Sequence, residues 1–167
     1  MADFIAAEEM GRQRGYWWSP NGEQLAVCRV DESPIDTWFI ADPAHPEKPA
    51  TEHRYPAAGT ANAKVTLHIV HRESAEAIEV ALPHTFEYLN SVSWSAAGLI
   101  AQLQTRDQKS IAVFSIDATN GNAVEIFTDT DDAWVELVSG VPALSATGKL
   151  VTTADREGAR RLQVDGV

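Results

Sequence analysis

The sequence predicts an all-β protein: a fragment of a β-propeller with about three four-stranded blades and one short N-terminal helix. Three observations lead to this expectation. Short segments rich in β-branched and aromatic residues fill most of the chain, separated by Gly, Pro, Asn and Asp clusters. A turn motif recurs at intervals typical of propeller blades. Only residues 3–12 favour a helix, where Asp3 can cap "FIAAEEMGR".

The composition narrows the classes of protein. With 167 residues, 44% of them hydrophobic, the chain can form one ordered domain with a sizeable core. A formal charge of −11 argues against a nucleic-acid partner, which would require a basic patch. No apolar run approaches the roughly 20 residues of a membrane helix. The start, "MADFIAAEEM", lacks the features of a signal peptide, so we expect a cytoplasmic protein.

The strand pattern begins after the helix and continues almost to the end of the chain. Between two of the later strands, Asn120-Gly121 favours a tight type I′ hairpin turn. The expected strands are QLAVCRV (24–30), TWFIA (37–41), KVTLHIV (64–70), AIEVAL (77–82), SVSW (91–94), LIAQLQT (99–105), SIAVFSI (110–116), AVEIF (123–127) and KLVTT (149–153).

Two residue types in these segments are expected to serve packing. The single cysteine, Cys28, excludes an intrachain disulfide, and its place in an apolar strand favours a small buried core residue over a reactive thiol. The tryptophans are large apolar groups that suit packing within and between blades. We expect this role for Trp17, Trp18, Trp38, Trp94 and Trp134.

A repeated motif sets the blade boundaries. "WWSPNGEQLAV", "SWSAAGLIAQL" and "ALSATGKLVTT" each place a bulky apolar residue before a Ser, a Gly three positions later, and then a strand. The serines are 76 and 50 residues apart, and about 50 residues suit one four-stranded blade. We therefore expect a helix and loop at 1–14, a first blade at 15–87 with a Pro-rich insertion, a second at 88–135 and an incomplete third at 136–167.

The third blade ends before a fourth strand, which suggests a piece of a larger ring. Open sheet edges favour pairing with another chain, so a homo-oligomer is possible.

Three segments together resemble the N-terminal propeller of the dipeptidyl peptidase IV group, within the prolyl oligopeptidase family of serine peptidases. The first combines "DFIAAEE" with "WWSPNG"; the second is "RYPAAGTAN"; the third joins "YLNSVSW" to "AQLQTRDQ". They occur in the family's order over residues 3–108. The chain departs from some members at Ala7, where they have a third glutamate, at Ala57, where the family has Lys, and at Arg12, near a small polar position.

The resemblance implies that Glu8 and Glu9 bind the free α-ammonium of a peptide substrate. From the residues alone, adjacent glutamates in a short helix are usually a solvated acidic face, and their side chains point about 100° apart. Two carboxylates nevertheless suit an ammonium group, which carries three donors and a full charge. In the family's arrangement, this anchor would also fix the distance between the substrate amine and the nucleophile, so that only two residues fit before the scissile bond.

The residues of a peptidase reaction are missing from this sequence, so no catalytic residue is assigned. No serine lies in the Gly-x-Ser-x-Gly context of a nucleophile elbow, and the resemblance implies an α/β-hydrolase domain downstream in the same parent chain. No cofactor is expected. No metal site is expected either, because His68 and His71 are three apart on a strand and so point to opposite faces, while 129–132 lacks the features of a calcium loop.

Three functions remain open. The chain can be the substrate-recognising and gating part of an Xaa-Pro dipeptidyl peptidase, or part of a related aminopeptidase with another preference at the second position. It can also be a non-enzymatic propeller that binds a protein or another ligand. The Glu pair favours the first two, since a scaffold does not need an amine anchor.

Overall fold

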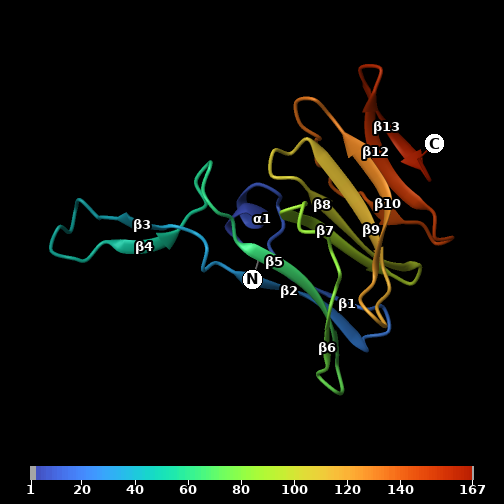
Figure 1. The fold of residues 1–167 in the computed structure, drawn as a ribbon, viewed down its shortest axis with the longest axis horizontal. Coiled ribbons are helices and arrows are strands. Elements are labelled where there is room, and N and C mark those ends of the chain that lie inside the picture. The colour runs from blue at the N-terminus through green and yellow to red at the C-terminus, as the bar shows by residue number, and fades with distance from the viewer. Residues whose placement is uncertain (1–2, 167) are drawn as a thin grey trace.

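The computed structural model describes residues 3–166, which form one short helix, three β-sheets and a separate hairpin (Figure 1). Helix α1 (Phe4–Glu8) precedes all the strands. All neighbouring strands within each sheet are antiparallel. The prediction of an all-β chain with one short N-terminal helix is therefore confirmed.

Each sheet follows the chain order, apart from an insertion in the first. The first sheet has the order β1 (Tyr16–Trp18), β2 (Gln24–Asp31), β5 (Lys64–His71) and β6 (Ala77–Glu79). The second contains β7 (Tyr88–Ser95), β8 (Gly98–Gln104), β9 (Ser110–Ile116) and β10 (Ala123–Thr130). The third contains β11 (Ala143–Leu144), β12 (Leu150–Arg156) and β13 (Ala159–Val164).

The second sheet is the centre of the molecule because it packs on both faces. Alternate residues of β8 point to opposite sides, as the pleat requires. Leu99, Ala101 and Leu103 belong to the main core, which also contains Leu67 and other residues of the first sheet, whereas Ile100 packs with Leu150 of the third sheet. Burial on both faces explains why β9 and the first half of β8 are almost continuously apolar rather than alternating.

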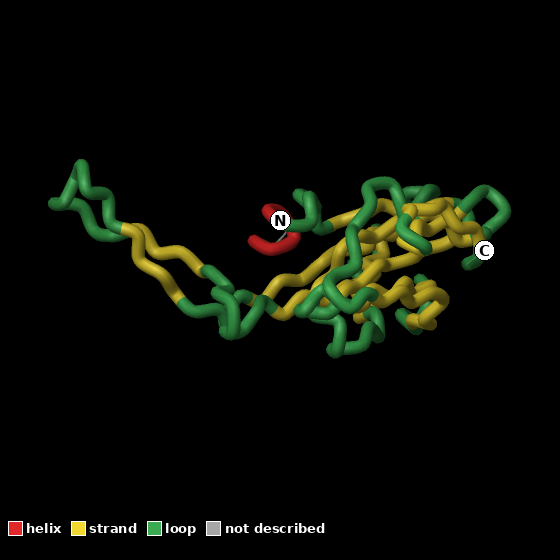
Figure 2. Tube along the Cα trace, turned by 90° about the horizontal axis from the view of Figure 1, so that it is seen from above, coloured by secondary structure: helices red, strands yellow, loops and turns green. Residues whose placement is uncertain are grey.

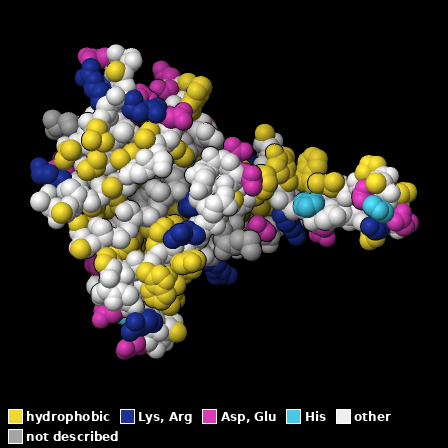
Figure 3. All heavy atoms as spheres, turned by 180° about the vertical axis from the view of Figure 1, so that it is seen from behind, with side chains coloured by type: hydrophobic (Ala, Val, Ile, Leu, Met, Phe, Trp, Pro, Cys, Tyr) yellow, Lys and Arg dark blue, Asp and Glu magenta, His cyan; other side chains and the backbone are white. Residues whose placement is uncertain are grey.

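The insertion in the first sheet forms an arm. Strands β3 (Thr37–Ile40) and β4 (Thr51–Arg54) pair only with each other and project away from the sheets (Figure 2). Phe39 and Ile40 are 68% and 60% exposed. Hydrophobic, acidic, basic and histidine side chains cover this projection (Figure 3). The arm adds little to the core.

Two details of the helix and turns differ from the sequence expectations. The helix ends at Glu8 rather than near residue 12, because Gly11 takes a φ of +64° and the chain turns back. The turn at 120–121 is not type I′, which needs positive φ at both central residues, because Gly121 has a positive φ and Asn120 does not. No helix among residues 3–166 is long and apolar enough to span a membrane.

The tryptophans divide into two groups. Trp17 and Trp94 are partly buried and pack against the main core, as expected. The packing role was wrong for the other three, which lie on surface strands or loops and are at least half exposed: Trp18, Trp38 and Trp134.

Candidate functional site

The end of α1 presents the two glutamates predicted to bind a ligand. Asp3 caps the helix, with Oδ1 accepting the Ala6 N–H at 3.1 Å, as the sequence predicted. Glu8 is the last helical residue and Glu9 is the C-cap. Both side chains are exposed, and among residues 3–166 neither carboxylate forms an ion pair.

The segment after Glu9 folds back and closes the helix. The backbone N–H of Arg12 donates to the Ala6 carbonyl at 2.8 Å, and Gln13 Nε2 donates to the Ala7 carbonyl at 3.0 Å. These bonds satisfy carbonyl groups that a helix end otherwise leaves without partners. The tight loop therefore fixes where Glu9 lies.

A buried ion pair holds this loop against the sheets. Arg12 Nη2 donates to Asp3 Oδ2 at 3.2 Å, and the two side chains are 6% and 10% exposed. Arg12 Nε donates to the Leu89 carbonyl on β7 at 2.9 Å, and Nη1 donates to the Arg14 carbonyl at 3.2 Å. All three guanidinium nitrogens are thus bonded, and one carboxylate both caps α1 and pairs with Arg12.

Cys28 on β2 lies beside this pair. Its sulfur is 3.9 Å from Arg12 Nη1, and burial raises the pKa of the thiol from 9.0 to about 11, against the opposing charge of Arg12. The cysteine is partly buried and packs against the main core, in line with the sequence prediction.

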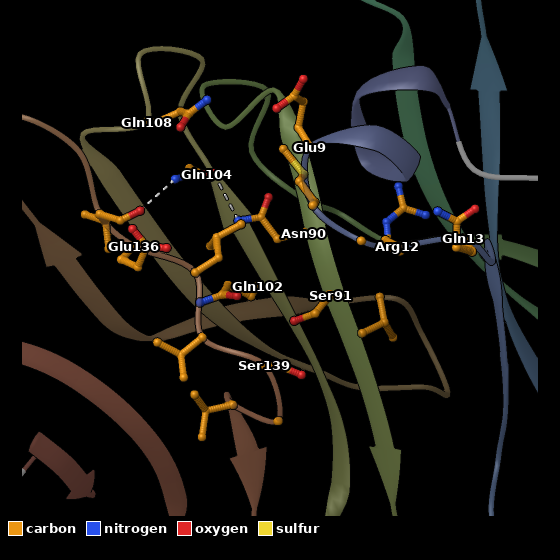
Figure 4. Close-up of a pocket in the computed structure, with 18 of the residues that line it drawn as sticks. Glu9, Arg12, Gln13, Asn90, Ser91, Gln102, Gln104, Gln108, Glu136 and Ser139 are labelled. Carbon is orange, nitrogen blue, oxygen red and sulfur yellow. Dashed lines mark hydrogen bonds between the residues drawn. The ribbon is translucent and has the colours of Figure 1, made fainter. Parts of the chain in front are cut away.

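Glu9 lies at the edge of a cavity of about 820 Å³, which is the size of a small-ligand site. The loop after α1 forms one side of the cavity, β7 and β8 form its floor, and residues 134–141 form the side opposite the loop (Figure 4). Glu136 supplies a second carboxylate, and its Oε2 accepts the Trp134 indole N–H at 3.3 Å. Glu8 does not line the cavity.

The floor carries a group of amides that the sequence reasoning missed as site residues. Asn90, Gln102, Gln104 and Gln108 all line the cavity. The alternation in "AQLQT" was a usable signal, because residues two apart on a strand share a face. It was hidden because the neighbouring residues made the whole segment look like core.

The histidines lie apart from the cavity. Among the described residues, no group of three His, Cys, Asp or Glu side chains is placed to hold a metal ion. His68 lies within hydrogen-bond distance of Thr66, with Nε2 and Oγ1 2.9 Å apart, and His71 lies beside Gln24, with 3.2 Å between their nitrogens. Both histidines have neighbours on the first sheet and lie outside the cavity.

Comparison with known families decides the relationship. Residues 1–164 match the family described as "Dipeptidyl peptidase IV (DPP IV) N-terminal region". The chain belongs to this family. The resemblance predicted from the three sequence segments is confirmed.

Two curated relatives illustrate the range of the family. The chain is 26% identical over 172 residues to rat inactive dipeptidyl peptidase 10, covering 96% of this chain and 21% of the relative. It is 27% identical over 170 residues to human dipeptidyl peptidase 8, covering 85% of this chain and 18% of the relative. The chain spans about a fifth of the length of the curated relatives it matches.

Solved structures of the family share the fold. Porphyromonas gingivalis dipeptidyl peptidase 4 matches with a TM-score of 0.85 at 21% identity, over 99% of this chain and 25% of that one. A putative dipeptidyl aminopeptidase IV from Bacteroides ovatus matches with a TM-score of 0.71 at 23% identity, over 89% of this chain and 22% of that one. The match to the N-terminal propeller region confirms that the three sheets are blades of a propeller.

Proposed function

We propose that this chain is the substrate-recognition and gating segment of a serine dipeptidyl peptidase that removes Xaa-Pro dipeptides from peptide N-termini. In this proposal Glu8 and Glu9 bind the α-ammonium of the substrate. The observation that carries it is the position of the pair: two adjacent carboxylates without ion partners among residues 3–166 end α1, and Glu9 lies at the edge of a ligand-sized cavity.

The chemistry of the site suits an amine. An ammonium group donates three hydrogen bonds, and each bond to a carboxylate contributes about 1.5–3 kcal/mol where water is partly excluded. The adjacent Arg12 does not oppose the ligand with a free positive charge, because Asp3 neutralises it at 3.2 Å. Arg12 itself therefore does not prevent the site from attracting a cation.

The rest of the reaction belongs to another part of the parent protein. The family relationship supports a downstream α/β-hydrolase domain that supplies the nucleophile. An amine held at a fixed distance from that nucleophile leaves room for two residues, so dipeptides are released and internal bonds are spared.

The test compares Gly-Pro and N-acetyl-Gly-Pro chromogenic substrates with the full peptidase that contains this segment. We expect cleavage of the free-amine substrate alone. The double variant Glu8→Gln/Glu9→Gln should lose about 2–4 kcal/mol of transition-state binding, measured as kcat/KM. Acetylation removes the positive charge that the two carboxylates would bind, so any residual cleavage of N-acetyl-Gly-Pro should not fall further in the double variant.

A matched control is Glu73→Gln/Glu76→Gln. These two exposed glutamates lie on the turn between β5 and β6, outside the cavity. The control substitutions remove the same amount of charge as Glu8→Gln/Glu9→Gln. An equal loss of kcat/KM in both double variants would therefore show a general electrostatic effect and contradict an amine anchor at α1.

A second candidate is a non-catalytic propeller that binds a protein or another ligand. The observation in its favour is that the rat and mouse relatives are named inactive dipeptidyl peptidases. Absence of hydrolysis of either Gly-Pro substrate by the full protein would favour this second function.

A further inference from the structure

Asn90, at the start of β7, carries a polar atom that the protein itself does not satisfy. Its side chain lines the cavity although the residue is only 5% exposed. Among the described residues, no donor bonds to Asn90 Oδ1. Figure 4 shows this oxygen directed toward the side of the cavity on which Glu9 lies.

A short relay of amides fixes the orientation of Asn90. Gln104 Nε2 donates to the Val135 carbonyl at 3.3 Å, and Asn90 Nδ2 donates to Gln104 Oε1 at 3.3 Å. Because a backbone carbonyl can only accept, the Gln104 amide nitrogen must face Val135. Gln104 then offers Asn90 an oxygen, so Asn90 turns its own oxygen away from Gln104 and toward the Glu9 side of the cavity, where neighbouring atoms cover it (Figure 4).

An oriented, buried acceptor favours a ligand that brings a donor. Leaving a buried carbonyl oxygen without a donor is unfavourable, and a ligand N–H or O–H that displaces the covering atoms and reaches Asn90 Oδ1 removes this cost. An apolar group in the same place would leave the cost in full. The site therefore discriminates by chemistry rather than by size.

The part of the substrate that can reach Asn90 follows from the proposed function, on which this inference rests. The α-carbon of the first residue bears the ammonium, the carbonyl and the side chain. The ammonium is held at Glu8 and Glu9, and the carbonyl must continue toward the hydrolase nucleophile. The side chain is the branch that is left to enter the cavity beside Glu9.

We propose that Asn90 Oδ1 accepts a hydrogen bond from the side chain of the substrate's first residue. The cavity then selects first residues that carry a donor, such as Asn, Lys or Arg. Glu136 and the cavity-lining amides Gln102 and Gln108 add to the polar surroundings of such a side chain.

The test uses matched chromogenic substrates with the full peptidase. Asn-Pro is compared with Leu-Pro, which has a similar shape without donors, and Lys-Pro with norleucine-Pro. We expect kcat/KM to favour each donor-bearing substrate about three- to tenfold, the range of one net hydrogen bond. In Asn90→Leu the Asn-to-Leu ratio should fall to near one, while N-acetyl-Gly-Pro remains uncleaved.

Two further variants test whether the substrate preference depends on Asn90 itself. Asn62→Leu is the matched control, because Asn62 also has a buried Oδ1 without a donor among the described residues but lies outside this cavity. It should leave the substrate preference unchanged. Asn90→Asp keeps the size of the side chain and adds a negative charge, so it should increase the Lys-to-norleucine ratio.

The outcomes separate this inference from the proposed function. Equal cleavage of both members of each pair by the native enzyme, or an unchanged preference in Asn90→Leu, overturns the role of Asn90 while the free-amine requirement for Gly-Pro stands. Loss of the free-amine requirement itself, or no cleavage of any substrate, overturns the proposed function and this inference with it.

Discussion

Among residues 3–166, two acidic side chains are buried beside an arginine, and their surroundings differ. Asp3 pairs with Arg12 at the candidate site, and both side chains are at most 10% exposed. Asp129 on β10 pairs with Arg156 on β12, joining the second and third sheets, and there the arginine side chain is 50% exposed. Both partners of the Asp3–Arg12 pair are shielded from water, whereas in the Asp129–Arg156 pair only the aspartate is shielded.

The difference indicates what each pair does. A desolvated pair must satisfy every polar atom to be tolerated, and Arg12 bonds with all three nitrogens across α1, its following loop and β7. This fixes one geometry for the loop that carries Glu9. Arg156 can exchange its bonds with water, so its pair joins two sheets without imposing a single geometry.

The largest effect on stability is expected from Arg12→Met. Methionine fills part of the space but leaves the Asp3 carboxylate buried without its partner, so unfolding should become easier by about 3–5 kcal/mol. Urea unfolding of the chain followed by tryptophan fluorescence measures this difference. A loss no larger than that of Arg156→Met would show that the two pairs are equivalent.

Cys28, which touches Arg12, should make stability depend on alkaline pH. The pKa of the thiol is raised from 9.0 to about 11 in the folded chain, so the folded state binds the proton more tightly than the unfolded state. Below pH 9 both states are protonated, and above it the unfolded state loses its proton first. Stability should therefore fall between pH 9 and about 11, by at most about 2–3 kcal/mol.

The measurement that isolates this term is the difference in unfolding free energy between the native chain and Cys28→Ala across that pH range. Tyrosines and lysines titrate in the same range but contribute to both proteins. A constant difference from pH 8 to pH 11 would mean that the thiol is as accessible in the folded chain as in the unfolded one.

Asp129→Asn should destabilise the folded chain less than Arg12→Met does. Asparagine keeps an oxygen for the Thr130 N–H, which donates to Asp129 Oδ1 at 3.0 Å, and removes only the charge that faces Arg156. Since Arg156 is half exposed, we expect a loss of about 1 kcal/mol in urea unfolding. Raising the salt concentration should reduce the loss, whereas the Arg12→Met effect should persist.

The sequence predicts the fold well because β-strands leave a local pattern. Apolar runs and Gly-containing turns indicated the sheets, and Asp3 indicated the start of α1. The end of the helix was missed because it depends on the Arg12 N–H reaching the Ala6 carbonyl, which side-chain periodicity does not show. The exposure of Trp38 was missed because an arm strand and a core strand have the same local composition.

The candidate site was only partly predictable for a related reason. The glutamate pair was predicted through the family segments around it. Asn90 and Gln104 were not found, because their role depends on β7, β8 and Val135 meeting in space. Nothing in the sequence near Asn90 indicates that its side chain lines a cavity.

The smallest expected effect on stability is that of Glu8→Gln/Glu9→Gln. Both glutamates are exposed and form no ion pair among residues 3–166, so their charges contribute little to folding, within about 0.5 kcal/mol. Urea unfolding of the double variant should therefore overlay that of the native chain. A clear stability loss would mean that the two charges hold the loop rather than a ligand, and a loss of kcat/KM in the same variant could then be structural. Unchanged stability with lost activity assigns the charges to binding, the opposite of Arg12, whose charge serves folding.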